Sequence, residues 1–158
     1  MDFELTKEQQ MIRQMVKDFA KAEIAPLAQT IDEQAVFPAK TFQKMGELGF
    51  MGIPFPEKYG GSGGDTISYA LAVEEIGKQC ASTGLSYAAA VSLGASPLYY
   101  FGTEDQKMDH LVPLASGTAL GSFGLTEPNA GSDAKGTKTK AVKDGQEYVN
   151  SGEKCWIT

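Results

Sequence analysis

The sequence has few of the residues that hold metals or form disulfides. Among its 158 residues it contains one histidine, His110, and two cysteines, Cys80 and Cys155, which lie far apart. Structural zinc sites need closely spaced cysteines and histidines, and disulfide frameworks need several cysteine pairs. We therefore expect neither a metal site nor a disulfide framework, and we interpret both cysteines as buried free thiols.

Basic clusters and long hydrophobic runs are also absent. Lysine and arginine number 14 against 20 aspartate and glutamate residues, which gives a net charge of -6. Binding to a phosphate backbone requires basic density, so this balance argues against nucleic acid as a partner. The first residues, MDFELTKEQQ, lack the features of a signal peptide, and no stretch approaches the roughly 18 apolar residues of a membrane span. These absences predict a cytoplasmic protein without a membrane partner.

Up to about residue 117 the pattern predicts helices. Thr6 and Gln9 have the spacing of a capping box before a helix with apolar residues Met11, Met15 and Phe19, and Pro26 is expected to kink or restart this helix. Further helices are expected at 38–48, at 66–79 with Asp65 as the cap, and from Thr103 to near Gly117. Between 48 and 65 the sequence is rich in glycine and proline and predicts a long ordered loop.

The stretch from Ser82 to Phe101 carries no charge at all. A helix without a polar face is either buried on all sides or lines a cavity. Pro97 lies within this stretch and is expected to bend or interrupt the helix.

After Gly117 the pattern changes to that of β-strands. ALGSFGLTEP is small and β-prone, and Asp144-Gly145 is a hairpin signal between two alternating runs. The final residues, EKCWIT, have strand propensity but no following strand to pack on. We therefore expect an α+β fold: an N-terminal all-α helical bundle over 1–117, and over 118–158 the start of an antiparallel β domain that is truncated.

Most of the individual residues and loops that could bind a ligand or take part in catalysis have a simple structural interpretation. The YGGSGGD loop matches neither common phosphate-loop motif, so a conformational role is expected. Glu74 and Glu75 are adjacent in a predicted helix, where a solvated face or an ion pair is expected, and His110 is expected at the surface. Glu127 and Asp133 could form an acid/base pair, but turn-capping carboxylates are common in such positions.

The stretch SFGLTEPNAGSDAKGTKTKA, from Ser122 to Ala141, combines a β-prone run with a small-residue turn. Such a segment offers backbone N–H groups and hydroxyls beside an apolar wall, which suits a planar heteroaromatic ring with a pyrophosphate tail. The residues alone leave two alternatives open, a nucleotide site and an ordinary β-turn.

At this point the sequence resembles the acyl-CoA dehydrogenases. GLTEPNAGSDAKG is similar to the first signature of that family, and further similar segments follow one another at family-like spacing over essentially the whole chain: LTKEQQMIRQMVKDFAKAEIAP, LGFMGIPFPEKYGGSGGD, SLGASPLYYFGTEDQK and NSGEKCWIT. Family members have an N-terminal helical domain, a middle β domain and a C-terminal four-helix domain. The resemblance implies that this chain covers the first domain and about a third of the second, with the C-terminal domain absent.

The resemblance implies FAD as the cofactor and oxidation of an acyl-CoA thioester to a trans-2-enoyl-CoA. In the family a glutamate removes the α-proton while hydride passes from the β-carbon to flavin N5. Leu125 and Thr126 would lie near the pyrimidine portion, Gly131 and Ser132 toward the phosphates, and Ser132 would also meet the substrate. Trp156, Ile157 and Thr158 would cover the other side of the flavin, and Thr158 would donate a hydrogen bond to N5. The residues expected to line the flavin are these three and Phe123, Gly124, Leu125, Thr126, Glu127, Pro128, Asn129, Ala130, Gly131 and Ser132.

Two departures from the family limit these expectations. Asn129 stands where the family often has glycine. The family's catalytic glutamate lies in the C-terminal domain, so no catalytic residue is expected in this chain, Glu127 included, and the chain alone is expected to be inactive.

The resemblance also implies partners and a setting for the whole enzyme. We expect a short-chain or butyryl-type substrate, electron-transferring flavoprotein as the electron acceptor, a role in fatty-acid β-oxidation, and a homotetramer. The charge-free stretch at 82–101 would form the wall of the acyl pocket. Two alternatives stay open: an oxidase or monooxygenase on the same fold, and a non-catalytic helical binding module.

Overall fold

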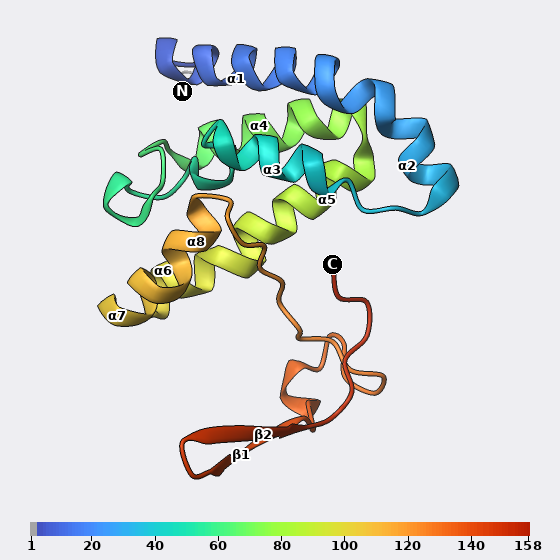
Figure 1. Cartoon of the computed structure of the whole chain (residues 1–158), viewed down its shortest axis with the longest axis vertical. Coiled ribbons are helices and arrows are strands. Elements are labelled where there is room, and N and C mark those ends of the chain that lie inside the picture. The colour runs from blue at the N-terminus through green and yellow to red at the C-terminus, as the bar shows by residue number, and fades with distance from the viewer. Residues whose placement is uncertain (1–2) are drawn as a thin grey trace. The chain divides into compact units, whose positions relative to one another are not determined.

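A computed structural model of the chain describes residues 3–158, and these divide into two compact units. The first unit ends at Gly121 and is helical; the second runs from Ser122 to Thr158 and contains a two-stranded antiparallel sheet (Figure 1). The predicted α+β class is thereby confirmed. The helical unit extends four residues past the boundary expected at residue 117. No helix among the described residues is long and apolar enough to cross a membrane.

Helix α1, Lys7–Phe19, begins as the sequence predicts. The Gln9 amide donates to Thr6 Oγ1 at 3.2 Å, and the Thr6 amide donates to Gln9 Oε1 at 3.0 Å, which together complete a capping box. Val16 and Phe19 are buried, whereas Met11 and Met15 are exposed. The helix is amphipathic, as predicted, and its buried stripe runs beside the two methionines on the same helix.

The chain continues from α1 through one π-helical turn, Ala20–Ile24, and one 3₁₀ turn, Ala25–Leu27, into α2, Ala28–Gln34. Pro26 lies at the start of the 3₁₀ turn. Because proline lacks an N–H, it cannot continue the α-helical hydrogen-bond ladder, and the helix restarts after it, in agreement with the prediction.

Helix α3, Ala39–Glu47, ends before Gly49, which takes a left-handed conformation with φ +75°. The glycine- and proline-rich segment that follows is ordered by burial. It forms two short 3₁₀ turns, Phe50–Gly52 and Glu57–Tyr59, and contributes a group of core side chains: Phe50, Met51, Ile53, Phe55 and Tyr59. This segment is thus part of the hydrophobic core and not a surface loop.

Helix α4, Thr66–Gln79, packs against α1 on one side and α5 on the other (Figure 1). Asp65 caps it, as predicted, by accepting the Ser68 amide at 2.7 Å. The Gln9 side chain donates to the same carboxylate at 2.7 Å. This contact links the N-terminal turns of α1 and α4.

The charge-free stretch forms one continuous helical path, and its exposed residues exclude the first of the two alternatives, burial on all sides. It consists of α5, Ala81–Ala88, a π-helical segment, Ala89–Ala95, and α6, Ser96–Phe101, with Pro97 in the first turn of α6. Tyr87 and Val91 lie in the core, but Leu85, Leu93 and Phe101 are exposed. One face is therefore apolar and open to solvent within this unit.

The last helical part begins at a second capping box, formed by Thr103 and Gln106. It comprises α7, Glu104–Gln106, a π-helical turn, Lys107–Leu111, and α8, Val112–Ala115. Gly117 follows with φ +73°, which is a conformation that glycine adopts without strain.

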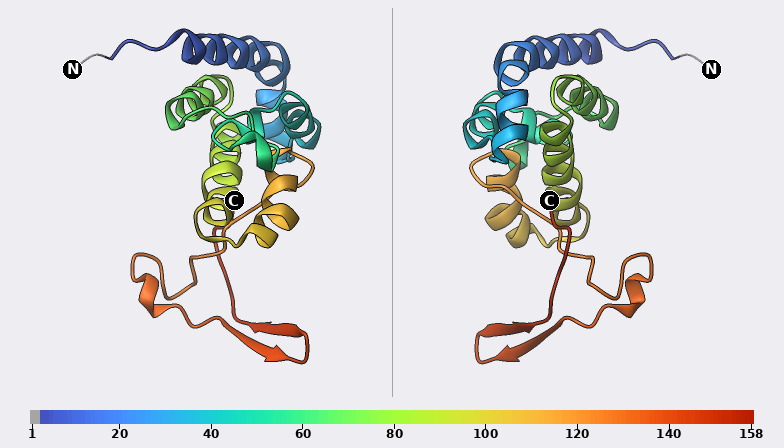
Figure 2. Two further views of the ribbon diagram at one scale, coloured as in Figure 1. Left: turned by 90° about the vertical axis from the view of Figure 1, so that its left-hand side faces the viewer. Right: turned by 90° about the vertical axis from the view of Figure 1, so that its right-hand side faces the viewer.

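In the second unit, β1, Lys140–Asp144, pairs with β2, Glu147–Ser151, in an antiparallel hairpin (Figure 2). Gly145, with φ +61°, forms the turn that the sequence predicts. The strands expected at 119–128 and in the final residues are not formed, which corrects the prediction. Their β-prone side chains have no neighbouring strand among the described residues to complete a backbone ladder.

The cysteines differ from each other. Cys80 is buried next to Ser82 and Thr83, whereas Cys155 is partly exposed. The interpretation of both as buried thiols is wrong for Cys155, whose neighbours Lys154 and Trp156 are exposed as well.

Candidate functional site

The segment from 122 to 132 is organised around one tight turn. The Glu127 amide donates to the Ala130 carbonyl at 3.0 Å, and the Ala130 amide donates back to the Glu127 carbonyl at 3.1 Å. Pro128 and Asn129 occupy the exposed tip between them. Proline has a fixed φ that suits such a turn. The turn therefore follows from local sequence, and it holds Gly131 and Ser132 next to the β-prone run before it.

The segment at 154–155 lies alongside 125–126. The Cys155 amide donates to the Thr126 carbonyl at 3.0 Å, and the Lys154 ammonium donates to the Leu125 carbonyl at 3.0 Å. The lysine stem also passes close to Gly124, where its Cγ would lie 3.6 Å from an added Cβ. The second unit thus places 154–155, directly before the expected flavin residues 156–158, alongside part of the other expected stretch, 123–132.

These contacts use the carbonyls of Leu125 and Thr126 as acceptors, while nearby backbone amides have no acceptor within the described part of the chain. Among the described residues, none accepts a hydrogen bond from the amides of Leu125, Thr126, Gly131 or Ser132. Gly131 has open space on its Cα, with no atom within 4 Å of an added Cβ. A group rich in acceptors, such as the pyrimidine carbonyls and phosphates of FAD, fits this donor set.

The apolar side chains of the expected site are accessible. Phe123, Leu125 and Ile157 are all exposed, and Trp156 is 90% exposed with a left-handed φ of +59°. Most of the remaining predicted residues are also exposed: Gly124, Pro128, Asn129, Gly131, Ser132 and Thr158. Only Glu127 and Ala130 are buried. The second unit therefore offers an aromatic and aliphatic surface next to free amide donors.

Glu127 has a role that the sequence did not reveal. Its carboxylate accepts the Lys138 amide at 2.7 Å, the Thr139 amide at 2.9 Å and the Lys154 ammonium at 2.9 Å. The pKa of Glu127 is lowered to about 2, first by the Thr139 hydroxyl beside it, then by the two amides and Lys154. That hydroxyl oxygen is buried and makes no well-formed hydrogen bond within the described chain. The amides and the ammonium therefore hold the carboxylate.

No local pattern could have indicated this arrangement. Lys138 and Lys154 lie 11 and 27 residues from Glu127, and lysines are frequent throughout this part of the chain. The only available signal was a glutamate directly before proline, which is typical of many turns.

The glycine-rich loop before α4 is not an anion site. Its successive amides donate to backbone carbonyls within the unit; the Gly63 amide, for example, donates to Phe55 at 2.9 Å and the Gly64 amide to Ile53 at 2.8 Å. A phosphate loop needs these donors free. At Gly61 an added Cβ would lie 2.1 Å from the Phe55 carbonyl oxygen. The glycines here permit close backbone packing, which agrees with the conformational role expected from the sequence.

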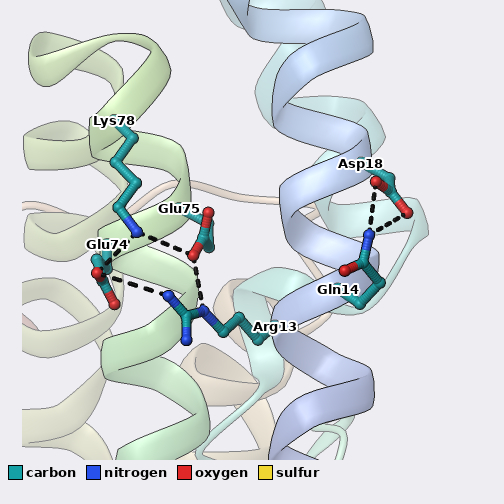
Figure 3. A network of polar contacts seen from close by, with 6 residues as sticks. All are labelled: Arg13, Gln14, Asp18, Glu74, Glu75 and Lys78. Carbon is teal, nitrogen blue, oxygen red and sulfur yellow. Dashed lines mark hydrogen bonds and ion pairs between the residues drawn. The ribbon is translucent and has the colours of Figure 1, made fainter.

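The adjacent carboxylates of α4 form an ion-pair network with α1 (Figure 3). Arg13 Nε donates to Glu75 at 2.8 Å, and Lys78 Nζ lies 3.0 Å from Glu75 and 2.7 Å from Glu74. The ion pair was one of the two expected alternatives. The other, a solvated face, does not apply to Glu75, which is only 3% exposed. His110 is exposed, as expected.

Comparison with known families identifies the helical unit. Residues 6–118 match the model described as "Acyl-CoA dehydrogenase, N-terminal domain". The chain is also 80% identical over 158 residues to a Bacillus subtilis (strain 168) protein named "Probable acyl-CoA dehydrogenase YngJ". That alignment covers 100% of this chain and 42% of the relative, so the chain spans less than half of the relative's length.

Comparison with solved structures points to the same family. A chain titled as butyryl-CoA dehydrogenase from Megasphaera elsdenii matches with TM-score 0.93 and 45% identity, covering 99% of this chain and 42% of that one. A chain from a structure titled as electron transferring flavoprotein of Acidaminococcus fermentans matches with TM-score 0.96 and 50% identity, covering 99% and 41%. A Bacillus anthracis acyl-CoA dehydrogenase complexed with FAD matches with TM-score 0.91 and 37% identity, covering 98% and 27%. The chain therefore belongs to the acyl-CoA dehydrogenase family.

Proposed function

We propose that this chain supplies the N-terminal helical unit and part of the flavin site of an FAD-dependent enzyme that oxidises short-chain acyl-CoA thioesters to trans-2-enoyl-CoA. The observation that carries the proposal is the set of free amides at 125, 126, 131 and 132 beside exposed aromatic side chains. FAD, when bound, supplies the hydride acceptor. The relatives named for acyl-CoA and butyryl-CoA dehydrogenases support the reaction and the short chain length.

The chain's own residues would bind and orient the flavin. The amides of Leu125 and Thr126 would donate to the pyrimidine carbonyls, and those of Gly131 and Ser132 to the phosphates. Such donors stabilise the more electron-rich reduced ring. Trp156 and Ile157 would cover the ring and exclude water, and Thr158 would donate to N5. Ser132 would also contact the substrate.

The charge-free path from α5 to α6 would line the pocket for the acyl chain. Its exposed apolar residues, such as Leu85 and Leu93, offer the kind of surface against which an alkyl chain packs. An apolar wall also explains why this stretch carries no charge. The proposal includes a short acyl chain as the one that this pocket admits.

None of the residues discussed acts as the catalytic base in this proposal. Glu127 is the carboxylate within the flavin segment 123–132, but three donors engage it and its pKa is lowered to about 2. A carboxylate held in this way is a poor proton acceptor, since its charged form is strongly favoured. Glu127 therefore remains outside the chemistry, as the sequence led us to expect.

The partners follow from the same relatives. We propose electron-transferring flavoprotein as the electron acceptor, supported by the solved structure with that title. A homotetrameric assembly and a role in fatty-acid β-oxidation rest on the family resemblance, and the cytoplasmic location expected from the sequence completes the proposal.

Titration of the chain with FAD tests the proposal directly. Trp156 is the only tryptophan and lies within the expected site, so its fluorescence should be quenched when FAD binds. The variant Gly131→Leu should weaken binding at least tenfold, because the added side chain meets no protein atoms and would occupy the approach to the free amides. Asn150→Leu, at an exposed position in β2, is the matched control and should leave binding unchanged. Absence of quenching with the unmodified chain, or equal binding by both variants, would contradict the proposal.

A further inference from the structure

Three separate backbone stretches converge on the Glu127 carboxylate. The amides of Lys138 and Thr139 come from the residues just before β1, and the Lys154 ammonium comes from the residues after β2. Glu127 itself belongs to the tight turn that it forms with Ala130. The Glu127 side chain is only 8% exposed, so its carboxylate has little water available to replace these donors.

Lys154 extends the same connection to the preceding residues. Its ammonium donates both to the Glu127 carboxylate and to the Leu125 carbonyl, and the neighbouring Cys155 amide donates to Thr126. These contacts fix 154–155 against 125–127. They also engage the carbonyls of Leu125 and Thr126, whereas the amides of the same two residues donate to no group among the described residues.

We propose that Glu127 and Lys154 form a positioning pair that sets the spacing between the segments 123–132 and 153–158, and thereby the placement of the amides that bind the flavin. This inference rests on the proposed function. Neither side chain touches the flavin in this role. The carboxylate acts through the turn and through Lys154, and the lysine acts through the backbone of Leu125.

The alternative is that the pair stabilises the second unit without affecting the flavin. A purely structural pair would change amide protection and stability, but the affinity and spectrum of bound FAD would stay the same. A positioning pair changes both, because donors displaced by a fraction of an ångström bind the ring acceptors less well.

The experiment combines two readouts on the 158-residue chain. Amide hydrogen exchange, measured by NMR without flavin, reports the contacts at Lys138, Thr139 and Cys155. FAD titration then gives the affinity, and the visible absorption spectrum and reduction potential of the bound flavin report the placement of the donors. The variants are Glu127→Gln and Lys154→Met, which each remove one charge and retain most of the side-chain volume.

Both variants should speed exchange at these three amides about tenfold and weaken FAD binding about tenfold, which corresponds to the loss of one charge-assisted hydrogen bond. The absorption band and the potential of the bound flavin should shift. The double variant should cost less than the sum of the two single changes, because both act on one contact. Lys154→Arg keeps a cation with several donors and should restore most of the affinity.

Matched controls come from the hairpin. Glu147→Gln and Lys143→Met make the same charge changes at exposed positions, and both should behave as the unmodified chain. Unchanged exchange at the three amides in Glu127→Gln would overturn the inference. So would faster exchange combined with unchanged FAD affinity, spectrum and potential.

The same data separate this inference from the proposed function. If the unmodified chain binds no FAD, the proposed function fails and the positioning role fails with it, while the exchange data still show whether the pair holds the two segments. If the unmodified chain binds FAD and the variants bind it equally well, the proposed function stands and only the positioning role is refuted.

Discussion

The buried carboxylate of Glu75 offers a quantitative test of the helical unit. It is 3% exposed and accepts hydrogen bonds from Arg13 at 2.8 Å and Lys78 at 3.0 Å (Figure 3). Hydrogen bonds to charged groups contribute about 1.5–3 kcal/mol each when they are shielded from water. The two cations are 40% and 45% exposed, so solvent screening reduces these contributions. We expect Glu75→Gln to lower the free energy of unfolding by about 1–2 kcal/mol.

The matched change is Glu74→Gln, which removes the same charge from the neighbouring residue. The Glu74 side chain is 48% exposed although it also contacts Lys78, so we expect a cost of about 0.5 kcal/mol or less. Urea unfolding followed by far-ultraviolet circular dichroism measures the helical unit, since the second unit contributes little helix. Equal costs for the two variants would refute the argument that burial decides the strength of this network.

The pH dependence of the same variant tests the electrostatic reasoning. Burial raises the pKa of Glu75, but the hydrogen bonds and charges of Arg13 and Lys78 outweigh it, and the pKa is lowered below 4.5. A lowered pKa in the folded state gives stability that is complete above the unfolded pKa and is lost as the pH falls through the folded pKa. The difference in stability between the unmodified chain and Glu75→Gln should therefore be constant near neutral pH and shrink below about pH 4.5. A difference that grows on acidification would contradict this assignment.

Three further substitutions in the helical unit use the same urea measurement. Gly61→Ala should destabilise the helical unit by about 3 kcal/mol or more, because the added Cβ would lie 2.1 Å from the Phe55 carbonyl oxygen. Gly77→Ala, where no atom lies within 4 Å, should instead stabilise α4 by about 0.5–1 kcal/mol, and the reverse order would refute the packing argument. Tyr87→Phe should cost about 1–2 kcal/mol, since it removes the 2.8 Å hydrogen bond to the buried Phe50 carbonyl and leaves only the 3.4 Å bond from the Ile53 amide; an unchanged stability would refute this.

Features set by a few neighbouring residues were predictable from the sequence. The capping boxes at Thr6 and Thr103, the Asp65 cap and the hairpin turn at Gly145 all follow from side chains that hydrogen-bond within three residues, or from a backbone conformation that glycine favours. The family signature likewise pointed to a flavin segment at 123–132. Segments that lacked such local partners, such as 119–128, were predicted less well.

Features that depend on distant partners were not predictable. The burial of Glu75 requires Arg13, which lies 62 residues away, and the burial of Glu127 requires Lys154, 27 residues away. The same applies to the exposure of Met11 and Met15, because nothing in the local pattern shows which stripe of α1 meets α4.

The sequence by itself determined the helical and hairpin elements, most of their ends, and the family to which the chain belongs, because capping and turn formation act over a few residues. Only the tertiary structure decided which polar groups are buried and which amides stay free. Burial depends on contacts between segments that are far apart in the chain, and an amide is left without a partner only when the surrounding fold supplies none.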